Sequence, residues 1–503
     1  MRVLEDVTTR RWSLATVAAT AGLVQLDVIA VQVALPALGQ EFRAGFHELQ
    51  WVIDAYAVAL AVFLLLAGSV SDRWGRKRTF TAGLCVFAAA SLACGLAGNT
   101  ELLIAARAVQ GVGGATLLAV GPALLSEVFT GRSRPRALAV FGSVAGFAMA
   151  FGPVVGGMLV LLGGWRLIFL INVPLCLLIG WALQRHVPVA TGRKAVATDW
   201  TGGALMIVAI TLTVVSAMSI GQQPVSGTLV WVVLAAAVVA MTAFLLTEAR
   251  RGADALLDLS LFRSITTNGM SLLALLTGAT SVPAIFFSMA YLQNRLGLSP
   301  ATAGLTLLPW TILIWAGNMA SARLLRICSP RGILITSMSF VAAGGVLAGL
   351  VRPLDSLAML LPMMVLFGLG MGLWNPVRLM VVLHEAGPGR AGLSSGHNQC
   401  LQQLGVVLGL SFTGVFFQTR VGTSLTGAVG PLPPEVLAGV AAGRFAQPAG
   451  QSAAQWEVAA RGAYQAAFQS TMLLIAAGAC VAAVVAASTV RSRHVLSSED
   501  TVS

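Results

Sequence analysis

The sequence predicts an all-α integral membrane protein with fourteen membrane-spanning helices, and composition, run length and charge placement each support this class. Of its 503 residues, 57% are hydrophobic and only 10% are charged, whereas soluble domains are about 45–50% apolar and about 25% charged. The apolar residues gather in runs of about 20 residues or more, the length that an α-helix needs to cross a hydrocarbon core about 30 Å thick. A soluble globular fold is therefore excluded.

Fourteen apolar runs meet this length requirement, and short polar or basic segments separate them. The first run is longer than the apolar core of a signal peptide, so we expect it to remain in the protein as the first span. The predicted spans are 13–36, 48–71, 79–98, 102–127, 137–160, 166–184, 201–220, 229–248, 266–293, 301–325, 332–351, 357–383, 394–420 and 468–489.

The positions of the basic residues test this count independently. If both chain ends are cytoplasmic, 22 of the 31 Lys and Arg residues fall in inner loops or at the ends, seven in outer loops and two within spans. Cytoplasmic loops of membrane proteins carry such an excess. The net charge of +12 is therefore an orientation signal rather than a nucleic-acid-binding patch. We expect a multi-pass protein of the inner (cytoplasmic) membrane with both termini in the cytoplasm.

A faint internal repeat suggests how the spans are grouped. The basic segment 321–331 follows the tenth span much as segment 68–78 follows the second, but it lacks the acidic residue and the central glycine of that segment. Many secondary transporters are built from paired six-helix halves. We therefore predict an N-terminal six-helix bundle at 1–190, a two-helix insertion at 191–262 and a C-terminal six-helix bundle at 263–503.

The one long outer segment, 421–467, is rich in Ala, Gly and Pro and has few charges. We expect it to contain a short surface helix around 451–463. A variable connector is favoured over a lid across the outer mouth.

Segment 68–78 contains five charged side chains, although only 10% of the residues in the whole chain are charged. Gly75 allows a tight turn, because glycine tolerates backbone angles that other residues resist, and four basic side chains hold the loop in the cytoplasm. A generic basic loop explains the cations but not the spacing of the glycines and the acid. The pattern G-x-x-x-D-R-x-G-R-K/R resembles the loop between helices 2 and 3 of major facilitator transporters, which implies the major facilitator fold and a latch on the inner gate in the outward-open state. This resemblance rests on Gly68, Asp72, Arg73, Gly75, Arg76, Lys77 and Arg78.

Three ionisable side chains lie well within predicted spans: Asp27, Asp54 and Arg107. Each costs about 2.5–3.5 kcal/mol or more at a helix centre, so each indicates a function. They lie roughly 14, 9 and 9 Å below the outer ends of their spans at 1.5 Å per residue, and we expect them to share an interior cavity. Burial favours a neutral carboxyl group and a nearby guanidinium favours a charged one, so such a site can load and release a proton. A static buried ion pair is the alternative; for Asp54, which is nearer the interface, the two explanations are equally consistent.

The segments around these residues resemble one family. Leu26–Pro36 reads L-D-V-I-A-V-Q-V-A-L-P, similar to the L-D-x-T-x-V-N-V-A-L-P signature of the fourteen-helix drug:proton antiporters, which include methylenomycin-, tetracenomycin- and puromycin-type antibiotic exporters. It departs at Ile29 and Gln32, where that family has Thr and Asn. Arg107 begins the family's R-x-x-Q-G-x-G-x-A motif, which implies that Arg107 takes part in proton coupling. Segment 165–174 resembles the start of the sixth span in the same family.

The fifth span carries several glycines on one helix face. Glycines at i and i+4 let neighbouring helices approach the backbone closely, and a proline within the span is expected to kink it. Helix packing alone explains the glycines, and it is compatible with a further role. The segment also matches G-P-x-x-G-G, a motif associated with antiporters among major facilitators. The residues concerned are Gly146, Gly152, Pro153, Gly156 and Gly157.

Amide and aromatic side chains within spans could line a pocket for an amphipathic compound, although most such residues only pack or anchor helices. Two basic residues near the inner end of the twelfth span, Arg378 and His384, are expected to snorkel towards the interface. The six cysteines have no metal-ligand spacing, and no metal site is predicted. The pocket candidates are Gln32, Gln110, Trp310, Trp315, Asn318, Trp374, Asn375, Asn398 and Gln402.

Together these features predict a transporter, not an enzyme, that couples efflux of a small amphipathic drug or antibiotic to protons by alternating access. The proton gradient supplies the energy without a cofactor; the sequence has no G-x-x-x-x-G-K-[ST] loop for ATP. We expect a monomer whose partners are the drug, protons and the lipid bilayer, with no nucleic acid. One alternative is a proton-linked or facilitated transporter of an endogenous metabolite or lipid. A second is a membrane-embedded enzyme that acts on lipid or isoprenoid, but the sequence has no acidic metal-binding cluster of the D-D-x-x-D kind. A third is a sensor or scaffold.

Overall fold

The computed structural model describes residues 2–129, 133–187, 200–219, 227–251, 264–325, 327–350, 357–386, 391–447 and 452–490. All regular elements in these ranges are helices, as the apolar runs predict. The first half of the chain forms α1 (Arg2–Glu41), α2 (Phe46–Trp74), α3 (Arg76–Gly95), α4 (Thr100–Val128), α5 (Ser133–Gly163), α6 (Trp165–Leu170) and α7 (Asn172–His186). The remainder forms α8 (Trp200–Ser219), α9 (Gly227–Arg251), α10 (Ile265–Ala290) with a π-helical turn at Tyr291–Arg295, α11 (Pro300–Thr306), α12 (Leu308–Leu324), α13 (Pro330–Leu350), α14 (Leu357–Ala386), α15 (Ala391–Val429), α16 (Pro434–Ala441) and α17 (Ala453–Thr489).

Helix lies within every predicted span, and the described residues account for fewer than fourteen candidate crossings. Among the described residues, eleven helical segments are long and apolar enough to cross a membrane, and thirteen if two bent pairs each count as one span. The predicted span 201–220 corresponds to α8, whose apolar described part, Thr201–Ser216, is shorter than these. The architecture is thus an all-helical membrane bundle with eleven to thirteen candidate spans.

The two bent pairs have local causes in the sequence. In α5, the limbs Arg136–Met149 and Phe151–Gly163 meet at 49°. The ring of Pro153 removes a backbone donor and crowds the carbonyl four residues earlier, on Met149, which is where the first limb ends. The second pair, α11 and α12, meets at 44°, and Pro309 lies in the first turn of α12.

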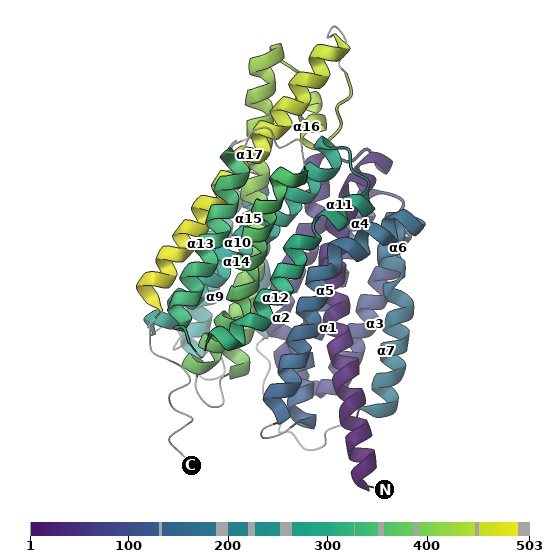
Figure 1. Cartoon of the computed structure of the whole chain (residues 1–503). Helices are drawn as coiled ribbons and strands as arrows, with labels where there is room; N and C mark the ends of the chain where they lie inside the picture. The colour runs from purple at the N-terminus through teal and green to yellow at the C-terminus, as the bar shows by residue number, and fades with distance from the viewer. Residues whose placement is uncertain are drawn as a thin grey trace.

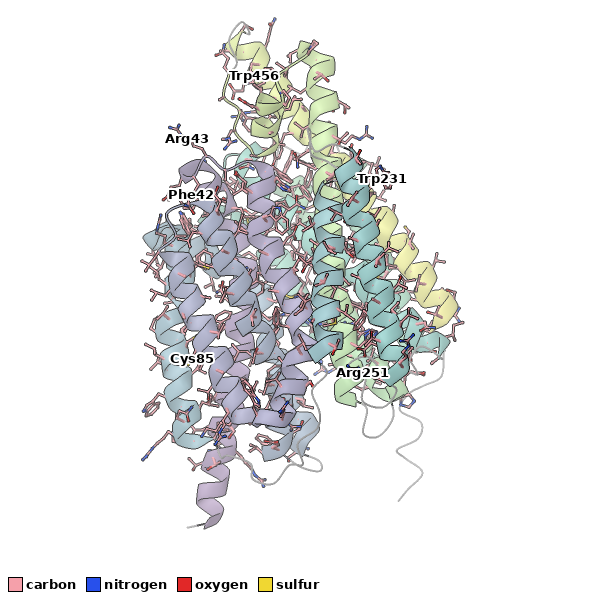
Figure 2. All side chains as sticks on the ribbon, turned by 180° about the vertical axis from the view of Figure 1, so that it is seen from behind. Phe42, Arg43, Cys85, Trp231, Arg251 and Trp456 are labelled. Atoms are coloured by element: carbon pink, nitrogen blue, oxygen red, sulfur yellow. The ribbon has the colours of Figure 1, made fainter. Side chains whose placement is uncertain are left out.

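The chain begins and ends on the same side of the bundle (Figure 1). The start of α1 and the end of α17 lie at what we call the proximal end, and α16 lies at the opposite, distal end. The pair α8 and α9, which the sequence predicts to be an insertion, packs side by side and contacts α2 and α15 through α8, as seen from behind in Figure 2. Buried residues of all four helices, such as Ala57, Ile210, Phe244 and Val406, form one apolar cluster.

At the distal end, the two halves are in close contact. The ring of Phe46 on α2 lies 6.2 Å from that of Phe287 on α10 and 5.8 Å from that of Phe417 on α15. Nε2 of Gln293 donates to the backbone oxygen of Val33 on α1 at 3.0 Å. These contacts join α1 and α2 to the second half, so the distal end is closed in this conformation.

The described residues of segment 421–467 are largely helical. In its described residues, α15 continues to Val429, α16 spans Pro434–Ala441, and α17 begins at Ala453. The helix expected around 451–463 is therefore the first part of the last span rather than a separate surface helix. Nη1 of Arg444 donates to the backbone oxygen of Ala44 in the first half at 2.7 Å, which fixes this projection onto the bundle (Figure 1).

Candidate functional site

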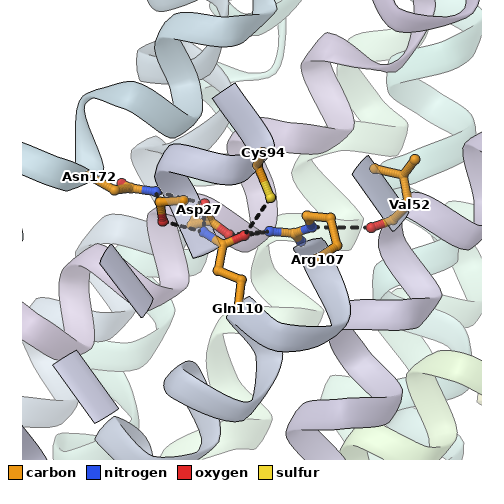
Figure 3. Close-up of polar contacts among 7 residues, drawn as sticks. Asp27, Val52, Cys94, Arg107, Gln110 and Asn172 are labelled. Atoms are coloured by element: carbon orange, nitrogen blue, oxygen red, sulfur yellow. Dashed lines mark hydrogen bonds and ion pairs between the residues drawn. The ribbon is translucent and has the colours of Figure 1, made fainter. Parts of the chain in front are cut away.

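Asp27 and Arg107 form a buried ion pair within the first half (Figure 3). Nη1 of Arg107, on α4, lies 2.5 Å from Oδ2 of Asp27, on α1, and the side chains are 1% and 0% exposed. Such a pair is retained only where its geometry is good and its remaining donors and acceptors are satisfied, because removing two charges from water is costly. The sequence prediction that these two residues meet is thus matched by their geometry.

Amide groups complete the surroundings of the carboxylate. Gln110, one turn after Arg107, and Asn172, at the start of α7, each donate to Oδ1 of Asp27 at 2.9 Å. Oε1 of Gln110 accepts from Nη1 of Arg107 at 2.7 Å, and its Nε2 also donates to Ser91 Oγ on α3 at 2.7 Å. We call these five residues the Asp27 network; it ties four helices together.

Arg107 also bridges this network to α2. Its Nε donates to the backbone oxygen of Val52 at 3.2 Å, and its guanidinium carbon lies 4.2 Å from the centre of the Tyr56 ring. A cation over an aromatic face is worth about 0.5–1 kcal/mol when exposed and about 2 or more when desolvated. Because Asp27 balances the charge of Arg107, protonation of Asp27 would leave the guanidinium with these contacts to α2 and its bond to Gln110.

Asp54 does not share the interior of this network, contrary to the prediction of one common cavity. Tyr56 faces Arg107, and residues two apart on a helix point about 200° apart, so Asp54 points to the opposite face of α2. There it is fully buried against α15, with Gln50 and Ser411 as polar neighbours. Neither carboxyl oxygen has a hydrogen bond of good geometry within the described part of the chain. Asp27 and Asp54 thus lie at separate sites, one within the first half and one between the halves.

The turn at Gly75 has a backbone conformation that glycine tolerates and other residues resist, as predicted. Its φ of +94° favours glycine, and the basic residues after it contact helix ends. Nη1 of Arg76 donates to the backbone oxygen of Ala123 on α4 at 2.6 Å and pairs with Glu127 at 3.2 Å. Nζ of Lys77 donates to the backbone oxygen of Val187 at 2.6 Å, just after α7. Cations near helix C-termini are stabilising, and these contacts stay within the first half.

The remaining residues of the 68–78 loop do not add to the evidence for a latch. Arg73 and Arg78 are exposed, and so is the backbone turn at Gly75. The side chain of Asp72 lies outside the described residues, so the predicted latch stays a prediction. Gly68 has open space around its missing side chain.

The glycines of α5 serve close helix approach. A side-chain carbon added to Gly152 or Gly156 would lie 2.7 or 2.8 Å from atoms of α1, and one added to Gly157 would lie 2.5 Å from the backbone oxygen of Pro300 on α11. Gly146 lies opposite Asn318 of α12, which would be 3.3 Å from an added carbon. The motif thus brings the second half of the chain against α5 at its backbone.

The predicted pocket candidates do not gather at one place. Gln110 belongs to the Asp27 network, Trp310 is buried and stacks on another core ring at 4.8 Å, and Trp315 is 40% exposed. Gln32, on α1, is 2% exposed, and neither of its amide atoms has a hydrogen-bond partner among the described residues. Gln32 is therefore a candidate whose polar atoms are left for a ligand, as are Trp310 through Nε1 and Asn318 through Oδ1. Gln402 is partly buried on α15.

The prediction that Arg378 snorkels to the interface is wrong. Its side chain is 4% exposed, and its Nη1 and Nη2 donate to Oδ1 of Asn398 at 2.5 Å and Oδ1 of Asn375 at 2.8 Å. The guanidinium carbon lies 4.6 Å from the centre of the Trp374 ring. These amide oxygens and the aromatic face solvate the cation inside the protein, so it need not reach the interface. Three pocket candidates are therefore partners of this arginine.

Sequence comparison identifies relatives of this chain. The family model of the Major Facilitator Superfamily matches residues 17–410. The tetracenomycin C resistance and export protein of Streptomyces glaucescens is 32% identical over 82% of this chain and 77% of its own length. The methylenomycin A resistance protein of Streptomyces coelicolor is 31% identical over 78% and 82%, and the multidrug efflux pump LfrA of Mycolicibacterium smegmatis is 29% identical over 94% and 96%.

Solved structures share the fold. A bacterial homologue of the human lysosomal transporter Spinster, in an inward-facing and unoccupied conformation, superposes with a TM-score of 0.66 at 17% identity and covers 95% of this chain and 97% of its own. A D-xylose–proton symporter gives a TM-score of 0.60 at 14% identity, over 95% and 98%. The chain belongs to the Major Facilitator Superfamily of membrane transporters, in the part of that family that includes antibiotic-resistance and multidrug-efflux proteins.

Proposed function

We propose that this protein exports a small amphipathic drug or antibiotic across the cytoplasmic membrane in exchange for protons, by alternating access. The observation that carries the proposal is the buried ion pair of Asp27 and Arg107. Arg107 also donates a hydrogen bond to the backbone of α2. An ion pair inside a membrane is costly, and a pair that only fixed packing would have no need to reach the helix that contacts the other half. The named relatives are resistance and efflux proteins, which supports drug as the cargo.

The geometry supports a path from proton to conformational change. A proton on Asp27 removes the charge that balances Arg107. The guanidinium then keeps the side-chain oxygen of Gln110, the backbone oxygen of Val52 and the ring of Tyr56, and the last two are on α2. Because α2 packs against α15 of the second half, a shift of Arg107 would alter the contact between the halves.

Asp54 would act as the second proton site, at that contact. It lies between α2 and α15, and an isolated carboxylate in an apolar interior is far more costly than a neutral acid. A proton on Asp54 would therefore favour packed halves, and its loss would favour their separation. We propose that Asp72 and its neighbouring cations stabilise the inner gate when the halves separate at the distal end.

Proton coupling would supply the energy. Moving one charge across the membrane potential is worth about 2.3 kcal/mol per 100 mV, and the pH gradient adds to this. We further propose that α8 completes fourteen crossings, that both termini are cytoplasmic, and that the protein works as a monomer.

Reconstituted protein tests the proposal. In vesicles with an imposed pH gradient, wild type should move ethidium against its concentration gradient, and internal pyranine should report the counterflowing protons. Asp27→Asn, which cannot lose a proton, should abolish gradient-driven transport. Glu101→Gln, an exposed acid on the same helix as Arg107, should transport as wild type does.

Energy-independent exchange separates coupling from damage. Asp27→Asn should still exchange labelled ethidium for unlabelled ethidium at equal pH, since exchange needs no net proton movement. Loss of this exchange in a variant that still elutes as a folded species would assign Asp27 a structural role only. A wild type that protects an efflux-deficient host from none of a panel of cationic and neutral antibiotics would contradict drug export.

A further inference from the structure

A groove between α3 and α7 opens towards the bilayer. Its volume is about 610 Å³, within the range of about 300–1,000 Å³ that binding sites for small molecules occupy. Leu84 and Ala88 on α3 and Leu177 and Trp181 on α7 form its apolar walls, and Gln184 and Arg185 lie at its proximal end. We call this the α3–α7 groove; the two helices that form it also carry Ser91 and Asn172 of the Asp27 network, but its proposed ligand does not depend on the proposed transport.

Small residues on both helices, Gly180 and Ala88, leave room for the groove. Gly180 has no side chain, and a carbon added there would lie 3.4 Å from Leu84. Ala88 adds little on the facing helix. Leu177 and Trp181 are 68% and 62% exposed, so in a membrane these apolar side chains meet lipid. An apolar groove of this size beside the bilayer is suited to an acyl chain.

The proximal end of the groove is polar and basic. Nε2 of Gln184 donates to Thr81 Oγ1 at 3.0 Å, which links the two helices at this end. Arg185 is exposed in the last turn of α7, and Nζ of Lys77 lies at the end of the same helix, 2.6 Å from the backbone oxygen of Val187. No lining residue of the groove is acidic.

Aromatic rings mark the depth of the interface at this end. The ring of Trp12, on α1, stacks on His186 at 4.7 Å, and the ring of Trp181 meets the same histidine edge-on at 6.0 Å. Tryptophan is enriched where the headgroups meet the hydrocarbon. A lipid whose chain lies along Leu177 would therefore carry its headgroup to the level of Arg185.

We propose that the α3–α7 groove is a binding site for an anionic phospholipid of the leaflet at the proximal end. One acyl chain lies between α3 and α7, and the phosphate and anionic headgroup are held by Arg185, with Lys77 contributing positive charge. Basic residues next to a membrane attract anionic lipids, and Arg matches phosphate geometry with two parallel donors. The charge of the groove end thus selects an anionic lipid over a zwitterionic one.

Quenching of tryptophan fluorescence by brominated lipid tests this site. The purified protein is reconstituted into phosphatidylcholine vesicles that contain a minor fraction of either dibrominated phosphatidylglycerol or dibrominated phosphatidylcholine. The signal of Trp181 is the difference between wild type and Trp181→Phe. Trp231, 70% exposed on α9 (Figure 2), gives the matched signal of ordinary lipid contact through Trp231→Phe.

Brominated phosphatidylglycerol should quench Trp181 at least twofold more than the phosphatidylcholine form, and both should quench Trp231 equally. Arg185→Gln should remove the difference at Trp181, whereas Arg323→Gln, an exposed arginine of the second half, should keep it. Ala88→Phe, which fills the groove, should lower quenching of Trp181 by both lipids. Equal quenching of Trp181 by the two lipids in wild type would overturn the proposal, whatever the transport assays give.

Discussion

Arg378 illustrates how a buried cation can be stabilised without an acid. No described carboxylate lies within ion-pair distance of it, and its partners are the amides of Asn375 and Asn398 and the ring of Trp374. Each of the two terminal nitrogens reaches a different amide. The planar fork of arginine makes this possible, and a lysine ammonium is a single point donor.

Arg378→Lys should therefore lose thermal stability in detergent. One amide oxygen would be left without its donor, at a cost of about 1–3 kcal/mol. Thermal unfolding followed by tryptophan fluorescence measures the change. Arg323→Lys, at an exposed position, is the matched control and should unfold with wild type. Equal unfolding temperatures for both variants would show that the forked contact adds no stability.

Tyr56 gives a second test at this scale, because it is the aromatic contact of Arg107 on α2. Tyr56→Leu removes the π face and should cost about 1–2 kcal/mol of stability, while Tyr56→Phe keeps the face and should stay near wild type. If our coupling path holds, Tyr56→Leu should also reduce proton-driven transport more than it reduces energy-independent exchange. A proportional loss of both activities would argue against the path.

Some residues of the site could be predicted from the sequence and others could not. Asp27, Asp54 and Arg107 could be predicted because a charge in an apolar run is conspicuous and costly. Asn172 and Ser91 could not be singled out, since small polar residues are common in spans and only the fold brings them to Asp27. Arg378 was misjudged because distance along one span suggested an interface position, whereas its partner Asn398 comes from another helix.

At the scale of elements, α5 depends on contacts that a single carbon would prevent. Gly157 approaches the backbone oxygen of Pro300 so closely that an added carbon would lie 2.5 Å away, whereas Gly142 of the same helix has nothing within 4 Å. Gly157→Ala should therefore separate α5 from α11 and shift the protein away from the distally closed conformation, and Gly142→Ala should not.

Spin labels at the distal ends of the two halves can measure this shift. Cysteines replacing the exposed Glu101 and Glu435, in a chain without its native cysteines, carry the labels. The distance distribution of Gly157→Ala should gain a longer component relative to wild type. Identical distributions for Gly157→Ala and Gly142→Ala would mean that the close approach does not hold the halves together.

Helix positions were predictable because run length and the membrane thickness constrain them, and all fourteen predicted ranges contain helix. The shapes of those helices were only partly predictable. Pro153 predicted a bend in α5, which is 49° in the structure. The composition of 421–467 did not indicate that α15 and α17 would each extend into this segment. Alanine-rich sequence is compatible with helix or connector, and packing decides between them.

At the scale of the whole molecule, the distal aromatic cluster closes one end of the transporter. Phe417 is fully buried and contacts Phe46 of the first half and Phe287 of the second. Phe417→Ala should cost about 3–5 kcal/mol of packing in this conformation, which favours opening at the distal end. Phe412→Ala, at a 65% exposed position on the same helix, is the control.

Accessibility to a water-soluble thiol reagent measures this opening. A cysteine introduced at Gln32, which is 2% exposed in the closed state, should react faster in Phe417→Ala than in Phe412→Ala or in the parent chain. Equal rates in all three would show that the aromatic cluster does not control access from the distal end.

The length of α15 and α17 has a practical consequence for imaging. With 39 and 37 residues, they run about 58 and 55 Å at 1.5 Å per residue, well beyond a hydrocarbon core of about 30 Å. Their projecting turns form an epitope outside the detergent belt, in which Trp456 Nε1 of α17 donates to the backbone oxygen of Phe445, just after α16, at 2.9 Å. A nanobody raised against it would give electron microscopists a fiducial on a protein that otherwise offers little to align.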